Sequence, residues 1–170
     1  MPLLEWLQSN PSVHVVSECF AVHNDLSGVE DALNTRAHLL PMSDASLFHF
    51  SLGLALAGTP TFLQWPTSDV ASLGGFVNQV SSELSASLIV RVPISGTVNL
   101  DTLRGSSAYS IVHDDHRSAV LKTALHRPGI YIILESLSAM ALHRLENRFI
   151  GLQADSSTLQ SSENPQCTVV

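Results

Sequence analysis

Short apolar runs alternate along the chain with longer segments of helical character. β-Branched and apolar residues dominate the short runs, which predict buried strands at residues 13–21, 61–65, 87–94, 108–112 and 131–134. The intervening segments predict helices at residues 29–37, 45–57, 67–84, 116–126 and 136–149. Strands that alternate with helices favour a mostly parallel sheet covered on both faces. The expected fold class is therefore a three-layer α/β domain.

The segment 45–57 is apolar on nearly every side, so the pattern predicts a helix that is buried all round. Ser43 or Asp44 is placed to cap its beginning, and Gly58 is placed to end it. The segment 67–84 has a weaker helical pattern, which Gly74 and Gly75 interrupt.

The 170 residues suit one domain with a full hydrophobic core. We assign residues 1–150 to this domain. Residues 151–170 are rich in Ser, Gln and Thr without periodicity, which predicts a polar, disordered tail. In parallel sheets the working site lies at the carboxyl ends of the strands. This principle directs attention to the loops after Phe20, Trp65, Ile94 and Val112.

Charge is sparse and acidic. Charged residues make up 14% of the chain, and 8 Lys and Arg against 15 Asp and Glu give a net charge of −7. This balance argues against nucleic-acid binding and against an anionic membrane surface. Two interpretations of the low charge stay open: a partner covers part of the surface, or Ser and Thr keep it soluble. The N-terminal segment lacks signal-peptide character and no apolar run is long enough to span a membrane, so a cytoplasmic location is expected.

Familiar catalytic and metal-binding motifs are missing from the sequence. Cys19 and Cys167 have no metal-site or disulfide pattern. The cluster of residues 113–116, His-Asp-Asp-His, is explained more simply by the start of a helix than by a metal site. The chain contains no P-loop, no Gly-x-Gly-x-x-Gly and no Gly-x-Ser-x-Gly motif.

The order of segments around residues 40–47, Leu-Pro-Met-Ser-Asp-Ala-Ser-Leu, carries a resemblance. An acidic residue precedes a small-residue helix (SLGLALAG), and a strand (TPTFLQW), a Ser/Thr loop, a helix with Asn-Gln-Val and an apolar strand (VRVPISG) follow. This order resembles the pyrimidine-binding domain of the transketolase family, which includes transketolases, deoxyxylulose-phosphate synthase and the beta subunits of 2-oxo-acid dehydrogenases. The resemblance covers residues 13–135. It implies a thiamine-diphosphate-binding fold of the pyrimidine type.

The resemblance implies a catalytic role for Asp44. In the family, a Glu at this place hydrogen-bonds a ring nitrogen of the thiamine diphosphate aminopyrimidine and so helps the cofactor to lose its thiazolium proton. Asp44 is one methylene shorter, which reduces its reach. The alternative is that Asp44 merely caps a helix.

Three further residues are implied at the cofactor. Glu18 matches an acidic residue that joins a hydrogen-bond network there, although a solvent-facing Glu at a strand end is an equal alternative. Ser68 stands near the position of an aromatic residue that stacks on the aminopyrimidine, and its side chain cannot stack. Trp65 could take over the stacking, although a Trp at a strand end is more often part of the core. The segment 97–105 also lacks the family's His.

The sequence contains no Gly-Asp-Gly motif, the signature of the domain that holds the diphosphate through magnesium in this family. The resemblance therefore implies half of a site, completed by a partner chain that carries the diphosphate-binding domain and the magnesium. The first hypothesis is a subunit of a thiamine-diphosphate-dependent decarboxylase, 2-oxo-acid dehydrogenase or ketol transferase acting on a 2-oxo acid or ketose. The second is a non-catalytic interaction or regulatory protein with a decayed site. A flavodoxin-like domain is a third, although residues 22–25 are a poor phosphate loop.

Overall fold

A computed structural model describes residues 3–18, 33–80, 83–94, 103, 107–111 and 114–136. Six strands form one sheet in the order β2-β1-β3-β4-β6-β5. The strands are β1 (His14–Glu18), β2 (Ala37–Leu40), β3 (Thr61–Gln64), β4 (Leu88–Ile94), β5 (Ser107–Ile111) and β6 (Ile130–Ser136). Every pair of neighbouring strands is parallel. The predicted parallel sheet is thereby confirmed.

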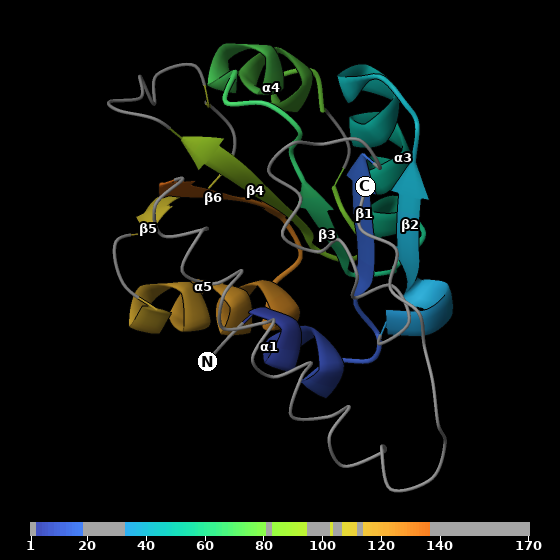
Figure 1. The fold of residues 1–170 in the computed structure, drawn as a ribbon, viewed down its shortest axis with the longest axis vertical. Helices are drawn as coiled ribbons and strands as arrows, with labels where there is room; N and C mark the ends of the chain where they lie inside the picture. The colour runs from blue at the N-terminus through green and yellow to red at the C-terminus, as the bar shows by residue number, and fades with distance from the viewer. Residues whose placement is uncertain are drawn as a thin grey trace, which may run out of the picture.

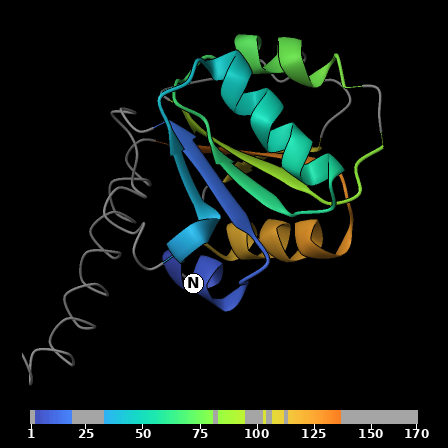
Figure 2. The same cartoon turned by 90° about the vertical axis from the view of Figure 1, so that its right-hand side faces the viewer.

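Helices cover both faces of this sheet, which gives the predicted three layers (Figures 1 and 2). Helices α3 (Asp44–Leu56) and α4 (Val70–Val77) lie on one face. Helices α1 (Leu3–Ser9) and α5 (Asp114–His126) lie on the other. A 3-10 turn, η1 (Asn34–Arg36), leads directly into β2. Figure 2 shows the two helical layers on opposite sides of the twisted sheet.

Each face of the sheet has its own hydrophobic cluster because successive side chains of a strand point to opposite faces. Along β4, Ile89 packs with α1 and α5, whereas Leu88, Val90 and Val92 pack with α3 and α4. All of these β4 side chains are fully buried. The near-continuous apolar run of β4 is therefore explained by a strand that is covered on both sides.

Two predicted elements differ from the observed ones. The predicted helix at 29–37 is wrong at its end, because Ala37 begins strand β2, and residues 29–32 lie outside the described part. The predicted long helix at 67–84 is shorter: α4 runs straight through Gly74 and Gly75 and ends at Val77, with Asn78 as its cap. Helix α1 was not predicted at all.

The other described elements fall close to their predicted positions. Helix α3 ends at Leu56, and Gly58 adopts φ 88° just beyond it, a left-handed conformation that glycine accepts without strain. The predicted helix at 136–149 and the tail at 151–170 lie outside the described residues, apart from Ser136, which ends β6. In the part of the chain that the structure describes, no helix is long and apolar enough to cross a membrane.

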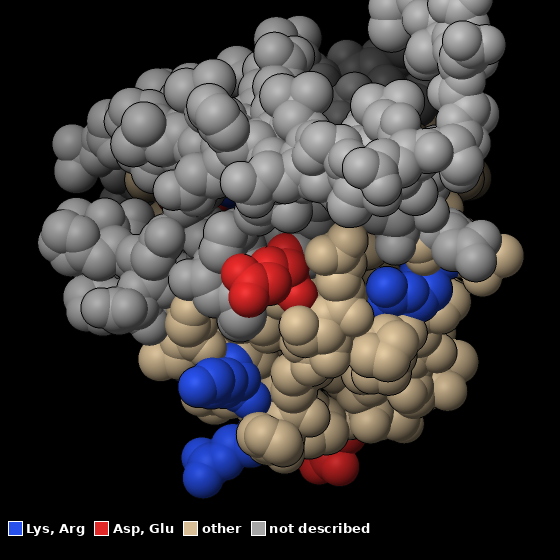
Figure 3. Space-filling model, turned by 60° about the horizontal axis from the view of Figure 1, so that its bottom comes forward, with Lys and Arg blue, Asp and Glu red and all other residues tan. Residues whose placement is uncertain are grey.

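Charged side chains are thinly spread on the side of the molecule that carries α1 and α5. Figure 3 shows a few Lys, Arg, Asp and Glu residues of both signs among many uncharged ones. Among the residues drawn there in colour, no continuous basic patch forms, which agrees with the acidic composition.

Candidate functional site at the carboxyl edge of the sheet

The strand order reverses between β1 and β3. From β1 the chain first moves outward to β2 and then returns across β1 to β3 and β4. In open α/β sheets, a crevice for ligands forms at such a reversal, outside the carboxyl ends of the strands. The two carboxyl ends at this point belong to Glu18 and Gln64. The topology therefore selects the loops after β1, β2 and β3 as the candidate site.

Asp44 lies at this edge, at the beginning of α3. Strand β2 ends at Leu40, and only residues 41–43 separate it from the helix. The hydroxyl of Ser43 caps the helix by accepting from the Ser46 N–H at 3.4 Å. Because Ser43 performs the capping, the capping alternative does not account for Asp44. Its carboxylate is half-buried at the positive end of the helix dipole, and it forms no hydrogen bond or ion pair in the described part of the chain.

Glu18 lies at the same edge. It is the last residue of β1, it is half-buried, and it stands opposite Leu40 in the parallel ladder. The register therefore places the ends of β1 and β2 side by side, with Asp44 four residues beyond Leu40. Two acidic residues that are distant in sequence thus lie at the same edge of the sheet, and their role at a cofactor stays a prediction.

Trp65 and Ser68 both follow β3, but Trp65 is buried and Ser68 is exposed. Trp65 is fully buried in the cluster beneath α3 and α4, with its ring 6.2 Å from that of Phe76. Its indole N–H has no hydrogen-bond partner among the described residues. Ser68 is exposed, beside Asp69, whose carboxylate caps α4 by accepting from the Ser72 N–H at 3.0 Å. The Trp65 ring therefore lies in the core, and Ser68 lies at the rim.

A row of buried polar side chains crosses the central strands, and sequence reasoning missed it. Ser17, Gln64 and Arg91 stand in register on β1, β3 and β4, and Glu135 lies on β6. All four residues are fully buried. Arg91 forms an ion pair with Glu135 and donates to the Gln64 carboxamide oxygen at 3.4 Å. The available signal was the lone Arg inside the apolar run of β4, because Arg is almost never fully buried unless it is paired.

The imidazole rings of two histidines connect β1 to β2. The Nδ1 of His14 and the Nε2 of His38 are 2.9 Å apart, and the ring centroids are 5.2 Å apart at an interplanar angle of 20°. The imidazoles therefore meet nearly end to end, and a single hydrogen lies between two nitrogens. His38 also packs edge-on against Phe50 of α3, with centroids 5.5 Å apart. The pKa of His38 is lowered by burial and, secondarily, by the neighbouring charge of His14.

This pair predicts a loss of stability on acidification. A pKa below the ordinary 6.5 in the folded state means that the unfolded chain binds more protons, so the contribution of His38 is complete above pH 6.5 and declines as pH falls below that value. Urea unfolding of the wild type between pH 7.5 and 5.5 should show this decline, and His38→Gln should flatten it. His126→Gln, at an exposed histidine of α5, serves as the control. An unchanged slope in His38→Gln would contradict the prediction.

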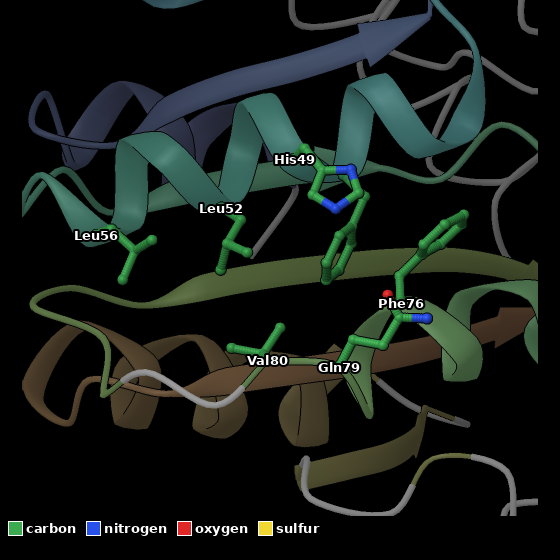
Figure 4. Close-up of a pocket in the computed structure, with 7 residues that line it drawn as sticks. His49, Leu52, Leu56, Phe76, Gln79 and Val80 are labelled. Atoms are coloured by element: carbon green, nitrogen blue, oxygen red, sulfur yellow. The ribbon is translucent and has the colours of Figure 1, made fainter.

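A small hollow of about 250 Å³ lies between α3 and α4 (Figure 4). Its walls are mostly apolar or aromatic, and the imidazole of His49 and the carboxamide of Gln79 are its polar groups. Its lining residues are Phe48, His49, Leu52, Leu56, Phe76, Gln79 and Val80. The His49 Nδ1 lies 2.7 Å from the Ala45 carbonyl, which fixes the imidazole as a donor at that nitrogen. In the described part of the chain, no group of three metal-ligating side chains comes together.

No protein-family model matches this chain, and no curated protein matches it. A solved structure described as "Split gene transketolase, inactive beta4 tetramer" does match, with a TM-score of 0.60 and 15% sequence identity. The match covers 79% of this chain and 48% of the solved chain, so the present chain spans about half the length of that protein. At this identity the likeness concerns the fold alone. The chain therefore has a transketolase-like α/β fold.

Proposed function

We propose that this chain is a subunit of a thiamine-diphosphate-dependent enzyme and supplies the aminopyrimidine half of the cofactor site to a partner chain. The observation that carries the proposal is the position of Asp44. Asp44 is half-buried at the beginning of α3, at the carboxyl edge of a transketolase-like sheet, and Ser43 is the residue that caps this helix. A carboxyl group so placed can share a proton with a ring nitrogen. The substrate class would be a 2-oxo acid or a ketose, in decarboxylation or ketol transfer.

The described residues fit this cofactor in part. Asp44 would hold the proton at the aminopyrimidine ring, and Glu18, half-buried at the neighbouring strand end, would support the hydrogen-bond network. The exposed hydroxyl of Ser68 is a further polar group at this edge, whereas the indole N–H of Trp65 is buried in the core. When bound, thiamine diphosphate supplies the nucleophilic carbon and the electron sink. Stacking on the ring would have to come from outside the described residues, because the Trp65 ring is in the core.

The outer face of α3 and α4 supports the existence of a partner chain. Residues 45–58 and 70–80 contain no charged side chain. The structure corrects the expectation that α3 is buried all round: Phe50 and Leu56 of this helix are exposed to 36% and 39%, and Met42, just before it, is exposed to 41%. We propose that these exposed apolar side chains belong to an interaction site. We assign it to the chain that carries the diphosphate-binding domain, since a charge-free surface favours an equally uncharged protein surface over a phosphorylated ligand.

A charge placed on this face should therefore prevent assembly. Leu56→Asp puts a carboxylate at the rim of the hollow, where the partner would have to bury it without a counter-charge. We expect the affinity for the partner to fall by about tenfold or more, measured by sedimentation velocity. Thr123→Asp adds the same charge to an exposed position of α5 on the opposite face and should leave assembly intact. Equal affinities for the two variants would contradict this interface, and assembly of the chain with itself alone would assign the face to a second copy.

Cofactor titration tests the proposed function. Thiamine diphosphate with Mg²⁺ is titrated calorimetrically into the chain alone, into a chain with a Gly-Asp-Gly diphosphate domain alone, and into their mixture. The proposal expects tight binding in the mixture and weak binding in each separate chain. Binding to the mixture that is no tighter than to the diphosphate chain alone would contradict it.

A second candidate function is a non-catalytic interaction protein of the same fold. The observation that favours it is the placement of Trp65 in the core and of an exposed Ser68 where the family stacks an aromatic. This candidate predicts assembly with the partner without any cofactor contribution. Asp44→Glu then changes neither binding nor turnover, whereas a gain in activity from this change would count against it.

A further inference from the structure

The hydrogen-bond ladder between β3 and β4 ends at a proline. The Trp65 N–H donates to the Arg91 carbonyl at 2.9 Å, and Gln64 stands opposite Arg91. In a parallel ladder, the next bond would run from the N–H of residue 93 to the carbonyl of Trp65. Residue 93 is a proline and has no N–H to give. The carbonyl of this fully buried residue therefore loses its ladder donor.

The side chain of Gln64 occupies the place of that donor. Its Nε2 donates to the Trp65 carbonyl at 3.3 Å, while its Oε1 accepts from Arg91 at 3.4 Å. The carboxamide has only this orientation, because a guanidinium can only donate and a carbonyl can only accept. Arg91 is itself held by its ion pair with Glu135 on β6. A chain of contacts thus runs from β6 through β4 to the point where β3 ends.

We infer that Gln64 is a positioning residue, whose side-chain amide replaces the ladder bond that Pro93 cannot make and fixes the backbone of Trp65. The loop of residues 65–68 leaves the sheet at this point, and Asp69 then begins α4. Arg91 and Glu135 act through Gln64. The positioning of this loop stands on its own hydrogen bonds, whereas its consequence for aminopyrimidine binding rests on the proposed function.

A double-mutant cycle between Gln64 and Pro93 tests the inference. Gln64→Met keeps the length of the side chain and removes both hydrogen-bonding groups, so the Trp65 carbonyl is orphaned. We expect the folding equilibrium constant to fall about tenfold or more. Pro93→Ala returns a backbone N–H to the ladder, so Gln64→Met should cost clearly less in that background, where only the contact between Gln64 and Arg91 is lost. An equal cost in both backgrounds would overturn the inference.

Tryptophan emission provides a readout that a merely structural role would leave unchanged. Trp6 and Trp65 are the two tryptophans of the chain, so Trp6→Phe leaves Trp65 as the sole emitter. Gln64→Met should make Trp65 more accessible to acrylamide quenching, and adding Pro93→Ala should restore the wild-type quenching. Unchanged quenching in the folded Gln64→Met variant would mean that Gln64 does not position Trp65.

One measurement remains decisive if Gln64→Met fails to fold. A through-hydrogen-bond scalar coupling between Gln64 Nε2 and the Trp65 carbonyl carbon is expected in the wild-type protein, together with slow exchange of the carboxamide hydrogens. Absence of both would overturn the inference. None of these tests requires cofactor or partner, so a failure of the proposed function would leave their results in place.

Discussion

Replacing Glu135 by leucine should lower the free energy of unfolding by about 3–5 kcal/mol. The reason is the position of its partner: the Arg91 and Glu135 side chains are each exposed to only 1%, so the substitution removes the carboxylate of a buried ion pair and leaves the guanidinium in the core. Attraction between the two charges is strong in this poorly screened environment, and the cost of an uncompensated ion is correspondingly high. Urea unfolding followed by circular dichroism measures the effect.

The matched control removes both charges. Arg91→Met combined with Glu135→Leu replaces a buried ion pair by apolar side chains of similar size, a change that is often neutral in stability. We expect the double variant to recover most of the loss, which assigns the cost to the loss of the Glu135 carboxylate beside Arg91. A double variant that is less stable than Glu135→Leu would show instead that Arg91 is needed for its contacts with Gln64 and other residues.

Under the proposed function, Asp44→Ala should reduce turnover by the assembled complex by about a hundredfold or more, the usual contribution of a proton-transferring side chain. The same substitution removes only a favourable charge at a helix N-terminus, worth about 0.3–1 kcal/mol, so the chain should remain folded. Steady-state turnover of a 2-oxo acid or ketose by the reconstituted complex measures the effect. Asp44→Glu restores the reach of the carboxyl group and should retain or raise the activity.

The control for Asp44 is Glu83, an exposed acidic residue just before β4, at the opposite edge of the sheet. Glu83→Ala removes the same charge from the chain and should leave turnover unchanged. If Asp44→Ala and Glu83→Ala were equally active, Asp44 would have no catalytic role, and the interaction protein would become the preferred function.

The elements found in the sequence are those whose burial leaves a simple pattern. Strand β4 is covered on both faces and therefore appears as an uninterrupted apolar run. Strand β2 was missed because it is an edge strand of only four half-buried residues, in which His38 interrupts the apolar residues. Helix α4 was predicted too long, because its Gly-rich segment has weak helical propensity and packing against the sheet decides its ends.

The same distinction between local and long-range features applies to the candidate site. The position of Asp44 at the start of a helix could be predicted because it is a local property of the sequence, and its role at the cofactor stays a prediction. The connection between Gln64 and Pro93 was not found, because it depends on the register of two strands that are distant in the chain. A proline normally argues against a central strand. Pro93 is tolerated in β4 because its nitrogen faces β3 at a point beyond the last residue of that strand. Side-chain compensation of this kind is visible only in three dimensions.

The most direct test of the central claim is the amide NMR spectrum of the isotope-labelled chain in complex with its partner, before and after addition of thiamine diphosphate and Mg²⁺. The account predicts shifts concentrated at the carboxyl edge of β1, β2 and β3, including the amides of Glu18, Asp44, Trp65 and Ser68. Residues 83–87 at the opposite edge should be unaffected. Shifts at that opposite edge, or a spectrum that the cofactor does not change, would contradict the claim that this chain supplies half of the cofactor site.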